Sequence, residues 1–234
     1  MAKRVAGVTA EAFLSQLGPE YHRKMAARRE QQLARAAAEQ AELSGLLGRI
    51  RETGFVTDSV DALRRSGVVY KKAIHLLLDE LFQPHSAGAL EQIVRAMSVP
   101  YAGPDAGPAL VRLFHLVPDE KENASLKWAI GNALEIVADG SLVDELLSVS
   151  LDRKFGRARQ MVVLALARFP SSEVIDGLVS LLDDADVGGH AVTALARMRD
   201  PRTHPWLERF RDDPRTWVRK EVRNAFAKGK RRKP

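Results

Sequence analysis

Histidine side chains are the first place to look for chemistry in this sequence, because imidazole binds metal ions and moves protons near neutral pH. The chain has six scattered histidines, and His75 is followed one helical turn later by Asp79 and Glu80. A helix would bring His75 and Asp79 to the same divalent ion. Without further ligands, however, a surface ion pair is the simpler expectation.

Other catalytic motifs are missing from the sequence. There is no cysteine, which removes disulfides, thiolate metal sites and cysteine nucleophiles. There is also no Gly-rich phosphate loop and no Gly-x-Ser-x-Gly nucleophile elbow. We therefore expect no catalytic residue, no metal site and no cofactor, and the sequence favours a binding protein over an enzyme.

Basic residues form the second set with chemical potential, and they are concentrated at the ends of the chain. The formal net charge is +6, but residues 1–52 hold nine Lys/Arg against six Asp/Glu, and residues 215–234 hold nine Lys/Arg against one Glu. The residues between them are therefore net acidic. Candidate contacts to nucleic acid or to an acidic partner are Arg215, Arg219, Arg223, Lys228, Lys230, Arg231 and Arg232. The alternative is a polar cap and solubilising tail that complements a helix dipole.

The elements that position these residues are predicted from motifs that recur in the C-terminal half. Four short apolar segments begin at Leu110, Leu146, Leu178 and Leu207, spaced by 36, 32 and 29 residues. A second motif follows each of them, as Ala133-Leu134, Ala165-Leu166, Ala194-Leu195 and Ala225-Phe226. Apolar residues eight and four positions before each Leu or Phe, and three after each Leu, draw one stripe at helical spacing. The pattern predicts stacked helix pairs.

The N-terminal part has a different character. We expect a short helix over Val8–Leu17 and then a solvated helix over Glu20–Arg51, whose last two turns present a buried face at Leu43, Leu46, Leu47 and Ile50. Further helices are predicted over Ser59–Leu63, Tyr70–Phe82 and Ala89–Met97. The expected organisation is a helical arm over 1–52, a stack of helix pairs over 53–228 and a basic tail over 229–234.

Two segments carry a resemblance to a known family. Residues 181–196 read LLDDADVGGHAVTALA, and residues 212–226 read DDPRTWVRKEVRNAF, with a Val-Arg pair after the turn. These segments resemble HEAT repeats, in particular the short bacterial PBS-lyase HEAT-like form. The resemblance implies an all-α, right-handed α-solenoid of antiparallel helix pairs that acts as a scaffold or adaptor. The paired aspartates before each second helix are expected to accept backbone N–H bonds that open it.

Binding residues are expected on the second helices, which line the concave surface in solenoids of this kind. Positions six and two residues before each Leu or Phe fall opposite the apolar stripe, and they give Trp128, Asn132, Gln160, Lys220 and Asn224 as candidate contacts to a protein partner. Packing against a neighbouring repeat is the alternative for Trp128 and Leu164, and solvation is the alternative for the amides and Lys220.

Three functions remain open at this stage. The favoured one is a cytoplasmic protein-interaction scaffold, since no export signal and no run of about 18 apolar residues is present. The second is a nucleic-acid-associated protein, including a DNA-glycosylase-like one, that uses the basic ends. The third, suggested by the name of the repeat alone, is a lyase or chaperone for a tetrapyrrole.

Overall fold

The computed structural model describes residues 18–227, and every regular element within that range is a helix. The chain divides into two compact units between Ser44 and Gly45. Each unit is described by itself below. The helix predicted over Val8–Leu17 lies outside the described residues.

The first unit contains helix α2 (Pro19–Glu42), a single 24-residue helix with no buried side chain. It begins with proline in the first turn, where the missing N–H has no helical partner to lose. Ion pairs one turn apart, between Glu20 and Lys24 and between Arg35 and Glu39, support it with N–O distances of 2.7 Å. The solvated character predicted for this segment is confirmed.

The prediction of one continuous helix over Glu20–Arg51 is wrong, because the helix is interrupted at Leu43. That residue leaves the helical conformation, with ψ near 6°, and its N–H caps the carbonyl of Glu39 at 3.1 Å. Ser44 and Gly45, both weak helix formers, follow at once. Helix α3 (Ser44–Glu52) then begins, and its Leu46, Leu47 and Ile50 are buried at the predicted spacing.

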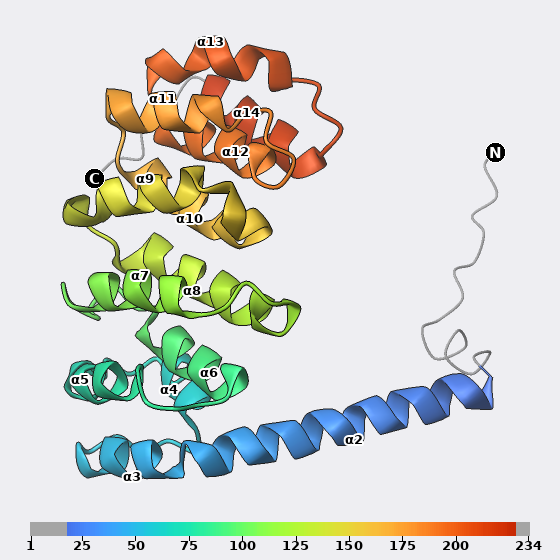
Figure 1. Ribbon diagram of the computed structural model, residues 1–234, viewed down its shortest axis with the longest axis vertical. Helices are drawn as coiled ribbons and strands as arrows, with labels where there is room; N and C mark the ends of the chain where they lie inside the picture. The colour runs from blue at the N-terminus through green and yellow to red at the C-terminus, as the bar shows by residue number, and fades with distance from the viewer. Residues whose placement is uncertain (1–17, 228–234) are drawn as a thin grey trace, which may run out of the picture. The chain divides into compact units, whose positions relative to one another are not determined.

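The second unit is a solenoid-like stack of helix pairs, seen from the side in Figure 1. The first helices of the pairs are α3, α5 (Lys71–Glu80), α7 (Ala106–Leu116), α9 (Val143–Leu151), α11 (Ser172–Ser180) and α13 (His204–Leu207). The second helices are α4 (Val60–Arg65), α6 (Ala87–Met97), α8 (Ala124–Val137), α10 (Gln160–Ala165), α12 (Gly188–Met198) and α14 (Thr216–Phe226). The predicted repeat pattern is therefore extended to six pairs.

Short 3-10 helices join or prolong these elements. They are η1 (Lys121–Asn123), η2 (Gly140–Leu142), η3 (Arg153–Arg159), η4 (Leu166–Arg168), η5 (Pro201–Thr203) and η6 (Glu208–Phe210). Aspartates open several of the turns by accepting a backbone N–H two residues later, at Asp139, Asp152, Asp184, Asp200 and Asp213. The predicted role of Asp184 and Asp213 is thus confirmed. Asp183 behaves differently, because its exposed carboxylate pairs with Arg209 at 3.0 Å.

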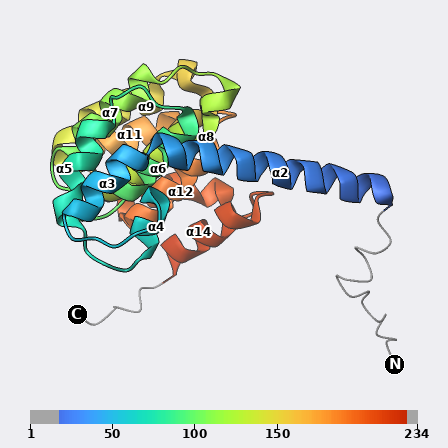
Figure 2. The ribbon, with the colours of Figure 1, turned by 90° about the horizontal axis from the view of Figure 1, so that it is seen from below.

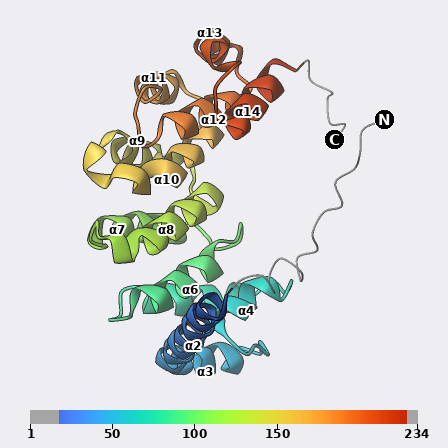
Figure 3. The ribbon, with the colours of Figure 1, turned by 90° about the vertical axis from the view of Figure 1, so that its right-hand side faces the viewer.

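The second helices form one row in which α4, α6, α8, α10, α12 and α14 contact one another in that order. From below, α5, α7 and α9 lie on one flank of the unit, and α12 and α14 lie on the other (Figure 2). Figure 3 shows the row bending, so that α4 and α14 at its ends extend further to the right of the view than α8 and α10. The core lies between the two rows of helices.

The apolar stripe predicted for the second helices faces this core. Leu134, Leu166 and Leu195 are buried, whereas Phe226 on the last helix is half-buried. Gly131 in α8 allows a close approach to α10, since a Cβ there would lie 2.6 Å from the Cβ of Met161. Close helix packing therefore explains this glycine in the middle of a helix.

Candidate functional site

The most prominent predicted binding residue is Trp128, near the start of α8. Its side chain is 43% exposed, on a row of helices whose other large apolar side chains are mostly buried. Asn132, one turn later on the same face, donates its amide N–H to the Trp128 carbonyl at 3.1 Å. A large exposed aromatic side chain costs hydration free energy in the free protein and gains it back when a partner covers it.

Two other predicted residues, Lys220 and Asn224, lie one turn apart on α14 and are exposed. Lys220 has no ion-pair partner among the described residues. Gln160 is placed differently, because its amide nitrogen donates to the carbonyl of Asp186 at 2.9 Å and so joins α10 to the turn before α12. Its side chain holds two repeats together, which leaves less of it for a partner.

In the middle of the row, the positions predicted to face solvent are buried. Leu164 and Thr193 are 7% and 2% exposed, and Gly189 is buried as well. A helical wheel assumes that only one face of the helix is buried. A helix in the middle of this row, however, packs against the row of first helices on one face and against neighbouring helices of its own row on both flanks. The solvent-facing strip is therefore narrower than the wheel predicts, and for Leu164 packing against a neighbour, the alternative raised from the sequence, is correct.

Three shallow hollows follow the row, with volumes of about 260 to 290 Å³. The first, between α4, α6 and α8, is lined by Arg64, Arg95, Ser98, Trp128, Ala129, Asn132, Glu135 and Ile136. The second, between α8 and α10, is lined by Ala124, Ser125, Trp128, Arg157, Ala158 and Gln160. The third, between α10, α12 and α14, is lined by Leu164, His190, Thr193, Arg197, Trp217, Lys220 and Glu221. Trp128 forms a wall of the first two.

An ion-pair chain crosses the row between these hollows. Arg197 on α12 pairs with Glu135 on α8 at 3.1 Å and lies 4.0 Å from Glu221 on α14. Because one arginine faces two glutamates, this part of the row carries no excess of positive charge. No sequence pattern indicated the pair, since its members are 62 residues apart.

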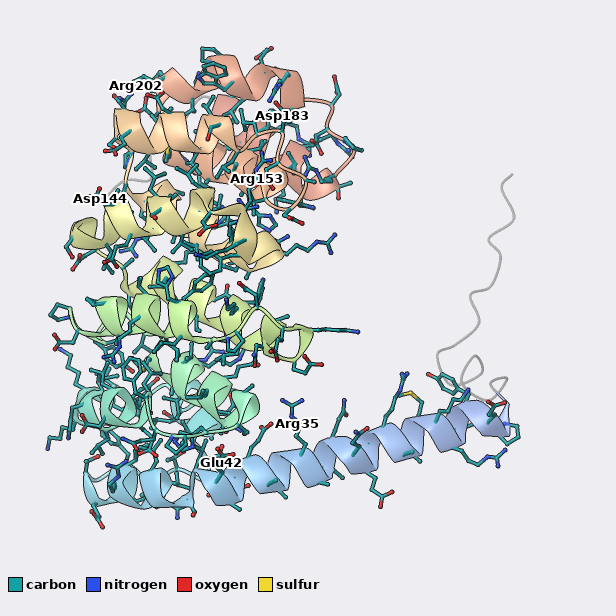
Figure 4. The ribbon with its side chains drawn as sticks, viewed as in Figure 1. Arg35, Glu42, Asp144, Arg153, Asp183 and Arg202 are labelled. Atoms are coloured by element: carbon teal, nitrogen blue, oxygen red, sulfur yellow. The ribbon has the colours of Figure 1, made fainter. Side chains whose placement is uncertain are left out.

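The arginine-rich turn over 153–159 forms ion pairs both within the turn and to the following repeat. Lys154 pairs with Asp152 at 2.7 Å. Arg159, however, is fully buried, and its guanidinium contacts both carboxylate oxygens of Asp184 in the following repeat at 3.1 and 3.2 Å. Arg153, labelled in Figure 4, lies 3.6 Å from the same carboxylate.

The environment of Asp184 shows how this buried pair is kept charged. Burial acts to raise the pKa of the Asp184 carboxyl, but hydrogen bonds from the Asp186 N–H, the Arg159 guanidinium and the Val187 N–H outweigh it and lower that pKa. Arg159 also donates to the Ser150 carbonyl at 2.9 Å. The pair therefore joins three consecutive segments and is structural rather than available to a ligand.

Of the basic residues predicted to contact nucleic acid, some form contacts within the protein, one is exposed and the others lie outside the described residues. Arg215 makes a two-pronged contact with Asp213 at 2.7 and 2.8 Å, which lowers the pKa of that carboxyl. Arg219 donates to the carbonyls of Asp213 and Pro214 at 2.5 and 3.0 Å. Arg223 is exposed. Lys228, Lys230, Arg231 and Arg232 lie outside the described residues.

The histidine and carboxylates first considered for a metal do not converge. His75 is exposed, and Glu80 contacts Arg49 and His85 instead of His75. Within residues 18–227 there is no group of three or more His, Cys, Asp or Glu side chains placed to hold a metal ion. None of the helices in that range is both long enough and apolar enough to span a bilayer.

Trp217 and His190 are the aromatic members of the third hollow, and sequence reasoning did not single them out as binding residues. The centroids of the two rings lie 5.2 Å apart, and Trp217 is 42% exposed. Gly189 makes room for the Trp217 ring, since a Cβ there would lie 2.7 Å from it. The sequence held one signal of this contact. Gly189 occupies a repeat position that carries a large side chain in the other copies, namely Trp128, Gln160 and Lys220.

Comparison with known proteins was informative for part of the chain. No curated protein matches it. Residues 143–227, which include α9 to α14, match the family model for HEAT repeats. The match, together with the all-helical, solenoid-like second unit, supports a HEAT-repeat protein.

Proposed function

We propose that this chain is a non-enzymatic scaffold that engages a protein partner through the concave face formed by its second helices. The proposal includes a right-handed solenoid of antiparallel helix pairs and a cytoplasmic location. HEAT repeats generally mediate protein–protein interactions. Curved stacks of helix pairs offer an extended surface rather than one enclosed pocket, which suits a partner chain better than a small substrate.

The observation that carries the proposal is the position of Trp128 between two hollows on the second-helix row. Tryptophan is enriched among the few residues that supply most of the binding energy at protein interfaces. Neighbouring Asn132 and Arg157 add hydrogen-bonding and charged groups at the rim of the same hollows. An exposed aromatic anchor with polar groups around it is the usual composition of such an interface.

The test compares two tryptophans of nearly equal exposure on opposite rows. Trp206 on α13 belongs to the first helices and is 46% exposed, so Trp206→Ala is the matched control for Trp128→Ala. A partner is first identified by cross-linking to the tagged full chain, and its affinity is then measured by titration calorimetry. We expect Trp128→Ala to weaken binding by about 30-fold or more, as for an interfacial hot spot, and Trp206→Ala to leave it unchanged. Equal affinities of the two variants would contradict the proposal.

A nucleic-acid partner is the second candidate, favoured by the exposed Lys220 and Arg223 next to the basic residues 228–233. It is weaker because Arg215 and Arg219 are already committed within the protein. The nucleic-acid hypothesis predicts a gel shift of DNA or RNA at low salt that disappears when the lysines and arginines of residues 215–234 are neutralised. No shift at low salt would eliminate it.

A further inference from the structure

The third hollow, between α10, α12 and α14, has the composition of a specific subsite. One wall is aromatic, made by Trp217 with His190 beneath it. Lys220, one turn after Trp217 on the same helix α14, also lines the hollow, and its ammonium group has no ion-pair partner among residues 18–227. Thr193 lies at the base, 2% exposed, and its hydroxyl has no hydrogen-bond partner.

The aromatic wall is fixed before any partner arrives. The Arg215 guanidinium lies over the Trp217 ring, 5.7 Å from its centroid, and is itself anchored by Asp213. His190 supports the ring on another side and is uncharged at neutral pH, because burial and the nearby Arg215 and Arg197 lower its pKa to about 4. A side chain that docks here therefore meets a preformed apolar surface, which reduces the entropy cost of binding.

The charges of the hollow select the kind of group that would fill it. Among its lining residues, Arg197 is compensated by Glu221, which leaves the single positive charge of Lys220. One carboxylate can neutralise that charge. A nucleic-acid backbone would bring several phosphates against Glu221 and, beyond it, Glu135. The balance therefore favours a single acidic side chain over a polyanion.

The unpaired hydroxyl of Thr193 points to the same chemistry. A buried hydroxyl without a partner costs about 1–3 kcal/mol, and rotation about its side-chain bond lets it donate to an acceptor placed in the hollow. A carboxylate oxygen is such an acceptor. It could accept from Thr193 while the second oxygen pairs with Lys220.

We propose that the hollow between α10, α12 and α14 is a docking site for an acidic peptide segment, with Lys220 pairing with its carboxylate, Thr193 donating a hydrogen bond and Trp217 packing on the adjacent apolar side chain. This inference rests on the proposed protein-binding function and names the chemistry of the partner at one end of the surface. It concerns a different hollow from the two that Trp128 lines.

The experiment uses the full chain and fluorescein-labelled, C-terminally amidated peptides of alternating Glu and Leu, with the same peptide carrying Gln in place of Glu as the control ligand. Fluorescence anisotropy reports binding. We expect the Glu peptide to bind at least about tenfold more tightly than the Gln peptide, as expected for hydrogen bonds to a charged group. Lys220→Gln should remove this preference, while Lys72→Gln, an exposed cation on first helix α5, should keep it.

Thr193→Val separates binding from folding. The variant keeps the shape of the side chain and removes an unsatisfied hydroxyl, so the fold should be at least as stable as before while the Glu peptide binds several-fold more weakly. Equal binding of Glu and Gln peptides, or affinity for the Glu peptide indifferent to both Lys220→Gln and Thr193→Val, would overturn the inference. Displacement of the peptide by oligothymidylate would assign the hollow to nucleic acid instead.

These outcomes are distinguishable from failure of the scaffold proposal. A partner whose capture depends on Trp128 but not on Lys220, with no preference for the Glu peptide, would leave the scaffold standing and refute the acidic subsite. Specific binding of the Glu peptide without any Trp128-dependent partner would support the acidic subsite and refute the proposal that Trp128 anchors a partner.

Discussion

The internal repeat that contains α10 and the terminal repeat that contains α14 carry the same sequence feature and use it differently. Arg159 and Arg219 occupy the same position in their repeats, each directly after the residue that begins the apolar stripe. Arg159 is buried and contacts Asp184 of the next repeat, whereas Arg219 donates to carbonyls of its own turn. The same repeat position thus supplies a link to the next repeat in one helix and a contact within its own turn in the other.

The repeats that contain α8 and α12 extend the comparison. In α8, the repeat position equivalent to Arg159 is occupied by Lys127. The Lys127 side chain is buried, and its ammonium group contacts Asp119 at 2.5 Å and the faces of the Phe114 and Phe155 rings. In α12 the equivalent position is Gly188, which has no cationic side chain to pair with Asp213 of the following turn. Asp213 pairs with Arg215 instead. At this junction a tilted contact between the His190 and Trp217 rings replaces the ionic link. The stack is therefore joined by charge in its middle and by aromatic packing near its end.

The largest expected effect comes from breaking the internal link. Arg159→Met leaves the Asp184 carboxylate buried without its guanidinium, and we expect the free energy of unfolding to fall by about 3–5 kcal/mol. Denaturant unfolding followed by circular dichroism measures this loss. Adding Asp184→Asn should restore part of the stability, because the uncompensated charge is then removed. A loss below that of the terminal Arg219→Met would refute the distinction between internal and terminal repeats.

The aromatic junction should be sensitive to pH. The pKa of His190 is about 4 in the folded chain, against an ordinary value of 6.5. As the pH falls below 6.5, His190 becomes protonated in the unfolded chain but stays neutral in the folded chain. The free energy of unfolding therefore decreases as the pH falls from 6.5 toward 4. Allowing for solvent screening, we expect a decrease of about 1–2 kcal/mol in the free energy of unfolding between pH 7.5 and pH 5. His190→Gln should flatten this dependence, and an unchanged slope in the variant would contradict the assignment.

Two glycines test how tightly each region is packed. Gly131→Ala in α8 places a Cβ against the Met161 Cβ, whereas Gly189→Ala in α12 meets the ends of the Arg215 and Trp217 side chains. We expect the first change to destabilise by about 1 kcal/mol, overpacking outweighing the higher helix propensity of alanine. The second should be nearly neutral by thermal unfolding. Equal costs at the two positions would mean that the terminal junction is as rigid as the internal one.

The smallest effect is expected from Arg219→Met in the terminal repeat. This change removes partly exposed hydrogen bonds to two carbonyls and leaves no buried charge behind, so the loss should be about 1 kcal/mol or less. The same denaturant experiment as for Arg159→Met measures it. A larger loss would show that the terminal turn contributes more to the stack than its contacts indicate.

Much of the fold was accessible from local sequence. The apolar stripe ending in Leu134, Leu166 and Leu195 predicted which helix faces are buried, because spacing along a helix fixes which residues share a face. The turn aspartates were predicted for a similar reason, since Asp184 acts within its own turn. The break at Leu43 was missed, because the strong helix formers before it and the apolar spacing after it favoured continuity.

The candidate site was predicted less completely. Trp128, Lys220 and Asn224 were placed on exposed parts of the second-helix row, but their role in binding stays a prediction. Leu164 and Thr193 were expected in the same solvent-facing columns and are buried, because neighbouring helices cover the flanks that a single-helix wheel leaves open. The basic tail over 229–234 lies outside the described residues, so the hypotheses about it are unchanged.

The sequence by itself determined the period of the helix pairs, the side of each helix that turns inward and the turns that aspartate opens. Each of these depends on contacts within a few residues. Only the tertiary structure decided that Arg159 links two repeats, that Arg197 reaches Glu135 across the row and that His190 supports Trp217. Such contacts depend on the distance and curvature between stacked helices, and helical periodicity carries no information about either.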